Sequence, residues 1–440
     1  GRIDYSLTNK VPESLRKAIA EGKKILVLIN PPYAEATNAD NVSAETHIDG
    51  KKDVSKTKIS NSMEDFGYAK RELFTQFVAR IAIEIPNATI AMFSTLKYVN
   101  APNFEKFREI WNVKYLGGYV VHSKAFDGLN GNFPIGFLVW KTNQNALSKT
   151  SIIEISLEVL DKNSIAIGEK TYYNLPNIIF LNSWLNRLKT NCINIPLKNA
   201  VSPRTDKAKV TQWIDSAIGY LLSNGNDVQH SSQQTAVLSS VYNTGGGFYI
   251  TKDNLWQAAI IFTVRRVIKP TWLNDRDQFL QPTGELTEEF KTDCLVWMLF
   301  NGSNLTASAN DLEWNGKKWS IVNHFITFTE EEVGAPDRFE SDFMVQYMED
   351  KVFSTEALTV LEAGKALWQA YFAHTDVRSV RDELKLNRSD VGWYQIRKAL
   401  QARNASGDFP PISFKSFDTA YKSLSEKLQP QVYEFGFLRV

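Results

Sequence analysis

Four consecutive residues, Asn30-Pro31-Pro32-Tyr33, have the types and order that could do chemistry in this 440-residue sequence. The exocyclic amine of a base is a poor nucleophile, because its lone pair is delocalised into the ring. The side-chain carbonyl of Asn30 and the main-chain carbonyl of Pro31 could accept hydrogen bonds from such an amine and push its nitrogen toward tetrahedral geometry. Proline has no N–H and a fixed φ, so it holds these acceptors rigidly. Tyr33 offers a flat face on which an extruded base can stack. We therefore predict that the catalytic residues are Asn30, Pro31, Pro32 and Tyr33, with no general base of shifted pKa required.

The elements around this tetrapeptide must place it at the end of a sheet. Residues 24–29 read Lys-Ile-Leu-Val-Leu-Ile, a short apolar run typical of a strand buried in a parallel sheet. The two prolines cannot continue a ladder of hydrogen bonds, so the chain leaves the sheet there. Apolar spacing then predicts, in order, a helix over 64–85, a strand over 88–93, a helix over 104–111, and strands over 115–121 and 135–140.

A long polar segment, residues 34–62, separates the tetrapeptide from the first predicted helix. Loops of this length inside a domain are usually functional or disordered. Its second half is basic, and Lys51, Lys52, Lys56 and Lys58 could neutralise phosphates. A mobile solvated insertion is the alternative interpretation.

An Asn-Pro-Pro-Tyr motif after a strand resembles the catalytic motif of the N6-adenine DNA methyltransferases of restriction-modification and related defence systems. The predicted elements over about residues 20–141 follow that family's order. The resemblance implies base flipping and methyl transfer from S-adenosyl-L-methionine to an adenine. It also implies a second base-stacking aromatic besides Tyr33, which would fall at Phe126 or at Phe133, with Phe126 preferred.

The sequence departs from this family at the cofactor. The family binds S-adenosyl-L-methionine through a glycine-containing turn between a strand and a helix, upstream of the catalytic motif. Only 23 residues precede the first predicted strand, and the Gly-rich run 244–248 stands in the wrong order and is interpreted as a turn. We expect the cofactor-binding half to lie upstream or on another chain, so this chain is not expected to methylate anything by itself.

The resemblance and the layout predict an α/β fold. Residues 1–150 would be the second half of a doubly wound Rossmann-like methyltransferase domain. Residues 151–335 would be an α+β DNA target-recognition region, and residues 336–440 a mainly helical C-terminal part. The basic and aromatic stretch 263–277 suits phosphate and base-edge contacts through Arg265, Arg266, Lys269 and Arg276, although a strand followed by a salt-bridged turn would read the same way.

Composition limits the remaining possibilities. The net charge is +1, so any nucleic-acid surface must be a local patch. Two cysteines and five histidines without paired spacing predict no metal site and no disulfide framework. No segment reaches the roughly 18 apolar residues of a membrane span, and a cytoplasmic location is expected. The expected partners are double-stranded DNA and an upstream methyltransferase half or a restriction subunit. The alternatives are a non-catalytic DNA-binding or specificity subunit, or a methyltransferase acting on RNA or protein.

Overall fold

The computed structural model divides the chain into two compact units. Unit 1 comprises Gly1–Ile178, Pro270–Gln278 and Arg439–Val440, and unit 2 comprises Ile179–Lys269 and Phe279–Leu438. The structure describes residues 11–32, 57–85, 87–129, 131–142, 154–174, 177–204, 208–243, 245–373, 390–403, 406–408 and 410–439.

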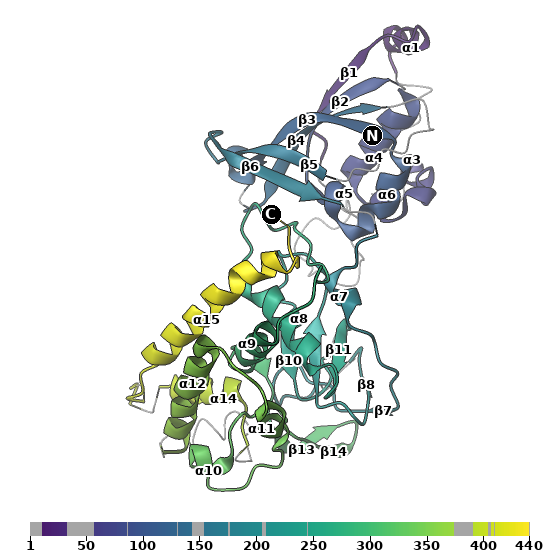
Figure 1. The fold of residues 1–440 in the computed structure, drawn as a ribbon. Coiled ribbons are helices and arrows are strands. Elements are labelled where there is room, and N and C mark those ends of the chain that lie inside the picture. The colour runs from purple at the N-terminus through teal and green to yellow at the C-terminus, as the bar shows by residue number, and fades with distance from the viewer. Residues whose placement is uncertain are drawn as a thin grey trace. The chain divides into compact units, whose positions relative to one another are not determined.

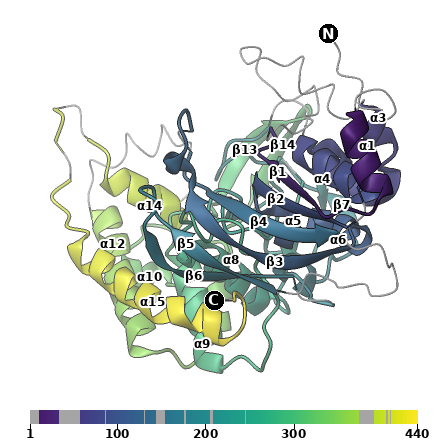
Figure 2. The same ribbon diagram turned by 90° about the horizontal axis from the view of Figure 1, so that it is seen from above.

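Unit 1 is built on a six-stranded mixed sheet with the strand order β1-β2-β4-β3-β5-β6 (Figure 2). The strands are β1 (Ile25–Ile29), β2 (Ala88–Ser94), β3 (Val113–His122), β4 (Pro134–Thr142), β5 (Glu154–Leu160) and β6 (Ala166–Tyr173). β1 pairs with β2 in parallel, whereas β4 is antiparallel to both of its neighbours. The four strands expected from the sequence are therefore present in the expected order, and the sheet is mixed.

The helices of unit 1 share its core with the strands of the sheet. They are α1 (Glu13–Ala20), α3 (Lys58–Asn61), η4 (Glu64–Arg71), α4 (Leu73–Glu84), α5 (Lys97–Asn100), η5 (Pro102–Phe104), α6 (Glu105–Ile110) and η6 (Ser123–Ala125). Buried aromatic rings from α4, α5 and α6, among them Phe74, Tyr98 and Phe107, pack against Met92 and Leu138 of the sheet. This packing fixes β2, and through it the end of β1.

One predicted helix is broken in the structure. The pattern over 64–85 predicts a single helix, but the structure has a 3₁₀ helix, η4, followed by α4. Gly67 has a φ of 63°, and Glu72 is extended and buried, with its carboxylate 3.0 Å from the ammonium of Lys97. The break follows from these two residues, because a left-handed glycine and an extended residue cannot continue the helical hydrogen bonds.

The sheet of unit 1 extends past the predicted domain boundary at residue 150. β5 runs parallel to β3 and forms a hairpin with β6. Ile155, Leu157 and Val159 of β5 are buried in the same core as the helices of unit 1. Residues 154–173 thus belong to unit 1 rather than to a target-recognition region.

Unit 2 holds both of the other predicted regions in one core (Figure 1). A four-stranded sheet with the order β11-β9-β10-β12 lies with two β-hairpins and a set of helices. Its strands are β7 (Cys192–Ile193), β8 (Gln212–Trp213), β9 (Gly219–Ser223), β10 (Thr235–Leu238), β11 (Gly247–Ile250), β12 (Asn304–Leu305), β13 (Ala309–Trp314) and β14 (Lys317–Ile321). Its helices are α7 (Leu181–Trp184), α8 (Leu255–Val267), α9 (Glu288–Leu299), α10 (Glu330–Val333), α11 (Phe343–Met348), α12 (Thr355–Ala373), α14 (Trp393–Leu400) and α15 (Lys415–Glu434).

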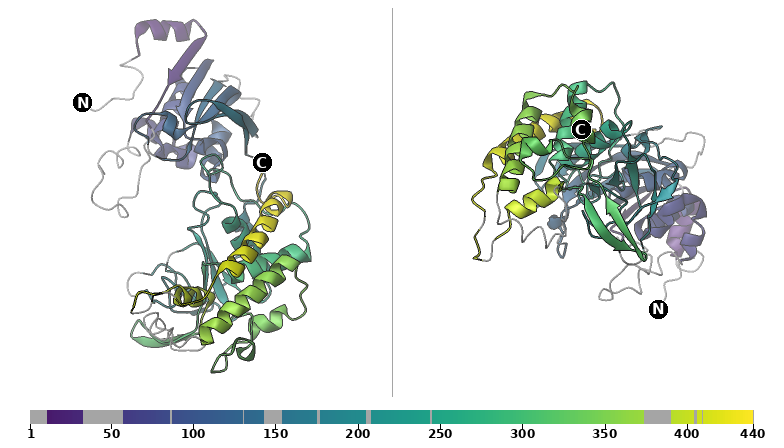
Figure 3. Two further views of the ribbon diagram at one scale, coloured as in Figure 1. Left: turned by 90° about the vertical axis from the view of Figure 1, so that its left-hand side faces the viewer. Right: turned by 90° about the horizontal axis from the view of Figure 1, so that it is seen from below.

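The helices of unit 2 begin at side chains that suit helix starts. The Thr287 hydroxyl accepts a hydrogen bond from the amide of Phe290 at the start of α9, and Thr329 with Glu332 forms a capping box on α10. α12 and α15 run side by side, as the green and yellow helices of Figure 3 show. No helix of the described residues is long and apolar enough to cross a membrane.

Candidate amine-binding site

The structure places Asn30 directly after β1, at the carboxyl end of a parallel strand pair. Ile29 pairs with Met92 of β2, so Asn30 lies one step beyond the last pair, next to the position of Phe93. Asn30 is exposed, and Pro31 behind it is buried. Carboxyl ends of parallel strands are where open α/β sheets bind their ligands. Asn30 therefore lies at the end of the sheet where such folds bind ligands.

Phe93 connects this strand end to the loop after β3. Its ring lies 5.3 Å from the ring of Phe126 in an edge-to-face contact and 4.8 Å from the ring of Phe137. Tyr119 stacks on Phe137 at 5.3 Å. These rings are half-buried and continue along one face of the sheet. A planar ligand at Asn30 would thus have an aromatic row beside it.

The two candidates for the second stacking aromatic lie in different surroundings. Phe126 contacts Phe93, whereas the Phe133 ring covers the backbone of Gly131, where an added Cβ would come within 2.5 Å of it. Ser123 holds the loop closed: its amide donates to the Phe133 carbonyl and its hydroxyl to the Gly131 carbonyl. Phe133 is therefore packed on its own loop, and Phe126 is the aromatic that faces β2.

The face of β1 that carries Leu26 and Leu28, which is also the face of Phe93 on β2, is open in the described structure. Leu26 and Leu28 have exposed fractions of 68% and 69%, whereas Ile25, Val27 and Ile29 are half-buried. β1 is also an edge strand of the sheet. A doubly wound domain has helices on both faces of its sheet, and on this face of β1 the described residues supply no such cover.

A basic and aromatic cluster lies beside the Phe126 loop, and sequence reasoning missed most of it. Trp272 belongs to segment 270–278 of unit 1. The centre of its ring lies 4.9 Å from the centre of the ring of His122, the last residue of β3. The Nδ1 atom of His122 accepts a hydrogen bond from the amide of Lys124. Burial, together with the charges of Lys124 and Lys162, lowers the pKa of His122. The lowered pKa favours the neutral imidazole, and the charged groups of this cluster are the exposed Lys124 and Lys162, with the Asp161 carboxylate beside them.

Segment 270–278 is held to unit 1 by polar contacts. The Lys170 ammonium lies 2.7 Å from the Asp277 carboxylate, and both side chains are nearly buried. The Tyr172 hydroxyl donates to the Leu273 carbonyl, and the Asn100 amide donates to the Arg276 carbonyl. Burial raises the pKa of Asp277 to about 6. These contacts occupy the Asp277 carboxylate and two main-chain carbonyls of the segment within unit 1.

The structure contradicts one of the predicted DNA contacts. Arg265 lies in α8 with no exposed surface, and its guanidinium donates to the Thr235 hydroxyl at 2.7 Å, the Asn224 carbonyl at 2.7 Å and the Gly225 carbonyl. Burial lowers its pKa to about 10, so it stays charged. The sequence showed an arginine in a basic stretch but not the apolar helix that buries it. Arg265 is a structural residue of unit 2.

The remaining predicted DNA contacts lie in several places. Arg266 donates to the Ser232 and Thr235 carbonyls, and Arg276 is mostly buried beside Asp275. Lys269 is exposed just after α8. Tyr33, Lys51, Lys52 and Lys56 lie outside the described residues. Lys58 is in α3, and its side chain lies outside the described part as well.

The described residues do not fit a cofactor cradle or a metal site. β2 enters α5 through Thr95 and Leu96, without a glycine-rich turn. The Gly-rich run leads into β11 of unit 2, and a Cβ on Gly246 would overlap the Asn224 side chain, which makes it a tight turn. No group of three or more metal-ligating side chains occurs in the described part of the chain. S-adenosyl-L-methionine therefore has no identified binding residues here.

Comparison with known proteins shows only distant structural similarity. No family model matches the sequence, and no curated protein matches it. The Type IIL restriction-modification enzyme MmeI, solved in complex with DNA, aligns with 96% of this chain at 10% identity and a TM-score of 0.31. The ATP-dependent Type ISP restriction-modification enzyme LlaBIII, solved bound to DNA, aligns with 53% of this chain at 12% identity and a TM-score of 0.23. These alignments span 56% of the MmeI chain and 16% of the LlaBIII chain. Similarity this low carries no conclusion about activity.

Proposed function

We propose that this chain carries the adenine-binding half of an N6-adenine DNA methyltransferase of a restriction-modification or phage-defence system. One observation supports it above the others: Asn30 stands at the carboxyl end of β1, next to Phe93, and Phe93 in turn contacts Phe126. An amide acceptor beside a row of aromatic rings suits a planar base that carries an amine.

In this proposal the chain positions and activates the amine. The Asn30 side-chain carbonyl and the Pro31 main-chain carbonyl accept one hydrogen bond each from the N6 amino group, which localises the nitrogen lone pair. Pro31 is buried, and Pro32 after it restricts the ψ of Pro31, so the direction of the Pro31 carbonyl is constrained. Phe126, with Tyr33, stacks on the extruded base. S-adenosyl-L-methionine supplies an electrophilic methyl group when bound, and the residues that hold it are not identified in this chain.

The cluster of His122, Lys124, Lys162 and Trp272 supports DNA as the substrate. Two exposed lysines beside the loop that carries Phe126 would neutralise phosphates next to an extruded base. An aromatic pair between them adds a surface against which a neighbouring base or sugar can pack. Replacement of Lys124 and Lys162 by glutamine should reduce the dependence of DNA affinity on salt, with a log–log slope smaller by roughly 2.

The decisive experiment uses the full-length gene product that contains this chain. It is incubated with mixed duplex DNA and methyl-labelled S-adenosyl-L-methionine, and digested DNA is examined for N6-methyladenine. We expect Asn30→Ala to reduce labelling roughly 100-fold or more. Asn132→Ala, an exposed asparagine in the loop before β4, is the matched control and should retain activity.

The other outcomes point to the other functions. Undiminished methylation by Asn30→Ala would show that the amine is held elsewhere. Label in RNA or in protein, with none in DNA, would favour a methyltransferase of another substrate class. Binding of DNA without any methyl transfer would favour a non-catalytic DNA-binding subunit.

A further inference from the structure

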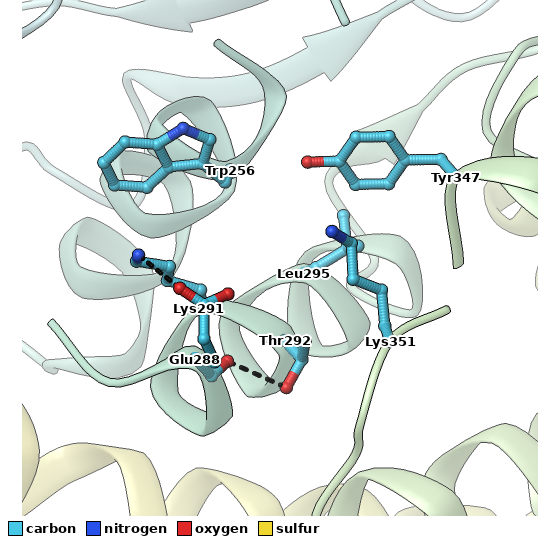
Figure 4. Close-up of a pocket in the computed structure, with 7 residues that line it drawn as sticks. All are labelled: Trp256, Glu288, Lys291, Thr292, Leu295, Tyr347 and Lys351. Atoms are coloured by element: carbon cyan, nitrogen blue, oxygen red, sulfur yellow. Dashed lines mark hydrogen bonds and ion pairs between the residues drawn. The ribbon is translucent and has the colours of Figure 1, made fainter. Parts of the chain in front are cut away.

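Unit 2 contains a cavity of about 230 Å³ that is remote in sequence from the Asn30 motif. Its lining comes from three helices and the turn after one of them (Figure 4). The lining residues are Trp256, Glu288, Lys291, Thr292, Leu295, Tyr347 and Lys351. The cavity lies wholly within unit 2, so its shape is independent of unit 1.

Two aromatic side chains form opposite sides of this cavity. Trp256, in the first turn of α8, and Tyr347, in α11, lie across the opening from one another, and the Tyr347 hydroxyl points inward (Figure 4). Each ring is supported from behind: Trp184 contacts Trp256 edge to face at 5.7 Å, and Phe343 stacks on Tyr347 at 5.9 Å. These contacts hold both rings in place at little cost in side-chain entropy, and Tyr347 presents its hydroxyl edge to the cavity.

Two lysines bring positive charge to the same cavity. The Lys291 ammonium lies 4.9 Å from the centre of the Trp256 ring, and the Lys351 ammonium lies 5.0 Å from the centre of the Tyr347 ring. Lys291 also contacts the Glu288 carboxylate at 2.7 Å. The hydrogen bond from Lys291, helped by the charge of Lys351, lowers the pKa of Glu288. With two cations and one carboxylate, the cavity keeps one uncompensated positive charge for a ligand.

We infer that this cavity is a nucleotide site, with the base against Trp256 and Tyr347 and the phosphate on Lys291 and Lys351. Two fixed aromatic walls, one of which ends in a hydroxyl, favour a heterocycle that carries polar groups, and the excess positive charge favours an anion. A nucleotide joins these two groups in one molecule, and the cavity has room for one such unit rather than for a folded chain. The ligand could be a free nucleotide or one unpaired residue of a nucleic-acid strand, because the two share this chemistry. The inference goes beyond the proposed methyl transfer and does not depend on it.

The test measures binding of defined probes to the full chain by calorimetry. The probes are adenosine monophosphate, adenosine, inorganic phosphate and a single-stranded hexamer of deoxyadenosine. We expect adenosine monophosphate to bind, and Lys351→Gln and Trp256→Leu each to weaken it roughly tenfold. Lys351 is exposed, so its replacement should leave folding intact. The matched control is Lys422→Gln, at a lysine of α15 that is 75% exposed.

The probes separate the two ligand sources and the two halves of the site. Phosphate should respond to Lys351→Gln alone, and adenosine to Trp256→Leu alone. Tighter binding of the hexamer than of adenosine monophosphate, with the same sensitivity to both variants, would assign the site to a strand, and the reverse order to a free nucleotide. No binding of any probe at millimolar concentration would overturn the inference. So would binding that neither variant changes, since the ligand would then occupy another surface.

Discussion

Replacement of Arg265 by methionine separates a structural role from a DNA-binding role for this residue. The wild-type guanidinium donates to the Thr235 hydroxyl and to the carbonyls of Asn224 and Gly225 inside unit 2. Methionine has a similar length but no donors, so the Asn224 carbonyl would lose its donor. The Gly225 carbonyl would keep the hydrogen bond from Asn182, and the Thr235 hydroxyl would keep the one it donates to the Ser231 carbonyl. A buried acceptor without a partner costs about 1–3 kcal/mol. We therefore expect Arg265→Met to lower the free energy of unfolding of unit 2 by about 1–3 kcal/mol.

The measurement is urea unfolding combined with hydrogen exchange read by mass spectrometry. Because the chain has two compact units, one spectroscopic transition need not report on both of them. Peptides from β9, β10 and α8 should exchange faster in Arg265→Met, and peptides from the sheet of unit 1 should not change. Lys422→Met, at an exposed position of the same unit, is the matched control and should shift nothing.

If Arg265 contacts DNA instead, we expect the opposite result. The salt-dependent affinity for duplex DNA would then fall in Arg265→Met, while the urea midpoint and the exchange rates stayed at their wild-type values. That result would refute the burial argument. Lys269→Met serves as the comparison, since Lys269 is exposed at the end of the same stretch.

Three further predictions concern Phe126 of the aromatic row, Asp277 of segment 270–278, and the contact of Gly364 in α12 with Phe300. Phe126→Ala should reduce methylation by the full-length protein roughly tenfold, because one base-stacking contact is lost, whereas Phe133→Ala should have a much smaller effect in the same assay. Asp277 has a folded-state pKa raised to about 6, so the folded state binds the extra proton. Unit 1 should thus lose about 2 kcal/mol of stability as pH rises from 4 to 7, and urea midpoints should show this loss in wild type but not in Asp277→Asn. Gly364→Ala would place a methyl group 2.1 Å from the ring of Phe300, so we expect a loss of about 1–3 kcal/mol by thermal unfolding; an unchanged melting temperature would contradict the close packing of α12.

The elements near the Asn-Pro-Pro-Tyr motif could be predicted because local sequence determines them. An apolar run ended by Pro31 and Pro32 is typical of a strand that stops there, and β1 ends at Ile29 as expected. The predicted burial was wrong, because β1 is an edge strand whose Leu26 and Leu28 are exposed. The runs at 88–93, 115–121 and 135–140 likewise lie within β2, β3 and β4. Periodicity did not show the break inside the helix over 64–85, since Gly67 and Glu72 interrupt it without disturbing the apolar spacing.

The candidate site could be predicted only in part, because its remaining members meet through the sheet. The types and order of Asn30 and Pro31 carry a chemical signal by themselves. Phe93 carries none, since its position beside Asn30 depends on the pairing of β1 with β2. His122 and Trp272 are 150 positions apart in sequence, and no pattern in either neighbourhood indicates their contact. The burial of Arg265 could not be predicted either. A basic stretch at the end of an apolar helix has the same sequence pattern whether its side chains face solvent or carbonyl groups.

The domain boundaries follow the same logic. The boundary predicted at residue 150 would remove β5 and β6 from a sheet whose core they complete. A cut at 178 keeps the six strands but loses segment 270–278. Lys170 would then lack the carboxylate of Asp277, and the Tyr172 hydroxyl would lack the Leu273 carbonyl. An unpaired, nearly buried lysine and a buried hydroxyl without an acceptor each destabilise the folded state. Unit 1 is therefore complete only when segment 270–278 is included, although helix α8 of unit 2 directly precedes that segment in the chain.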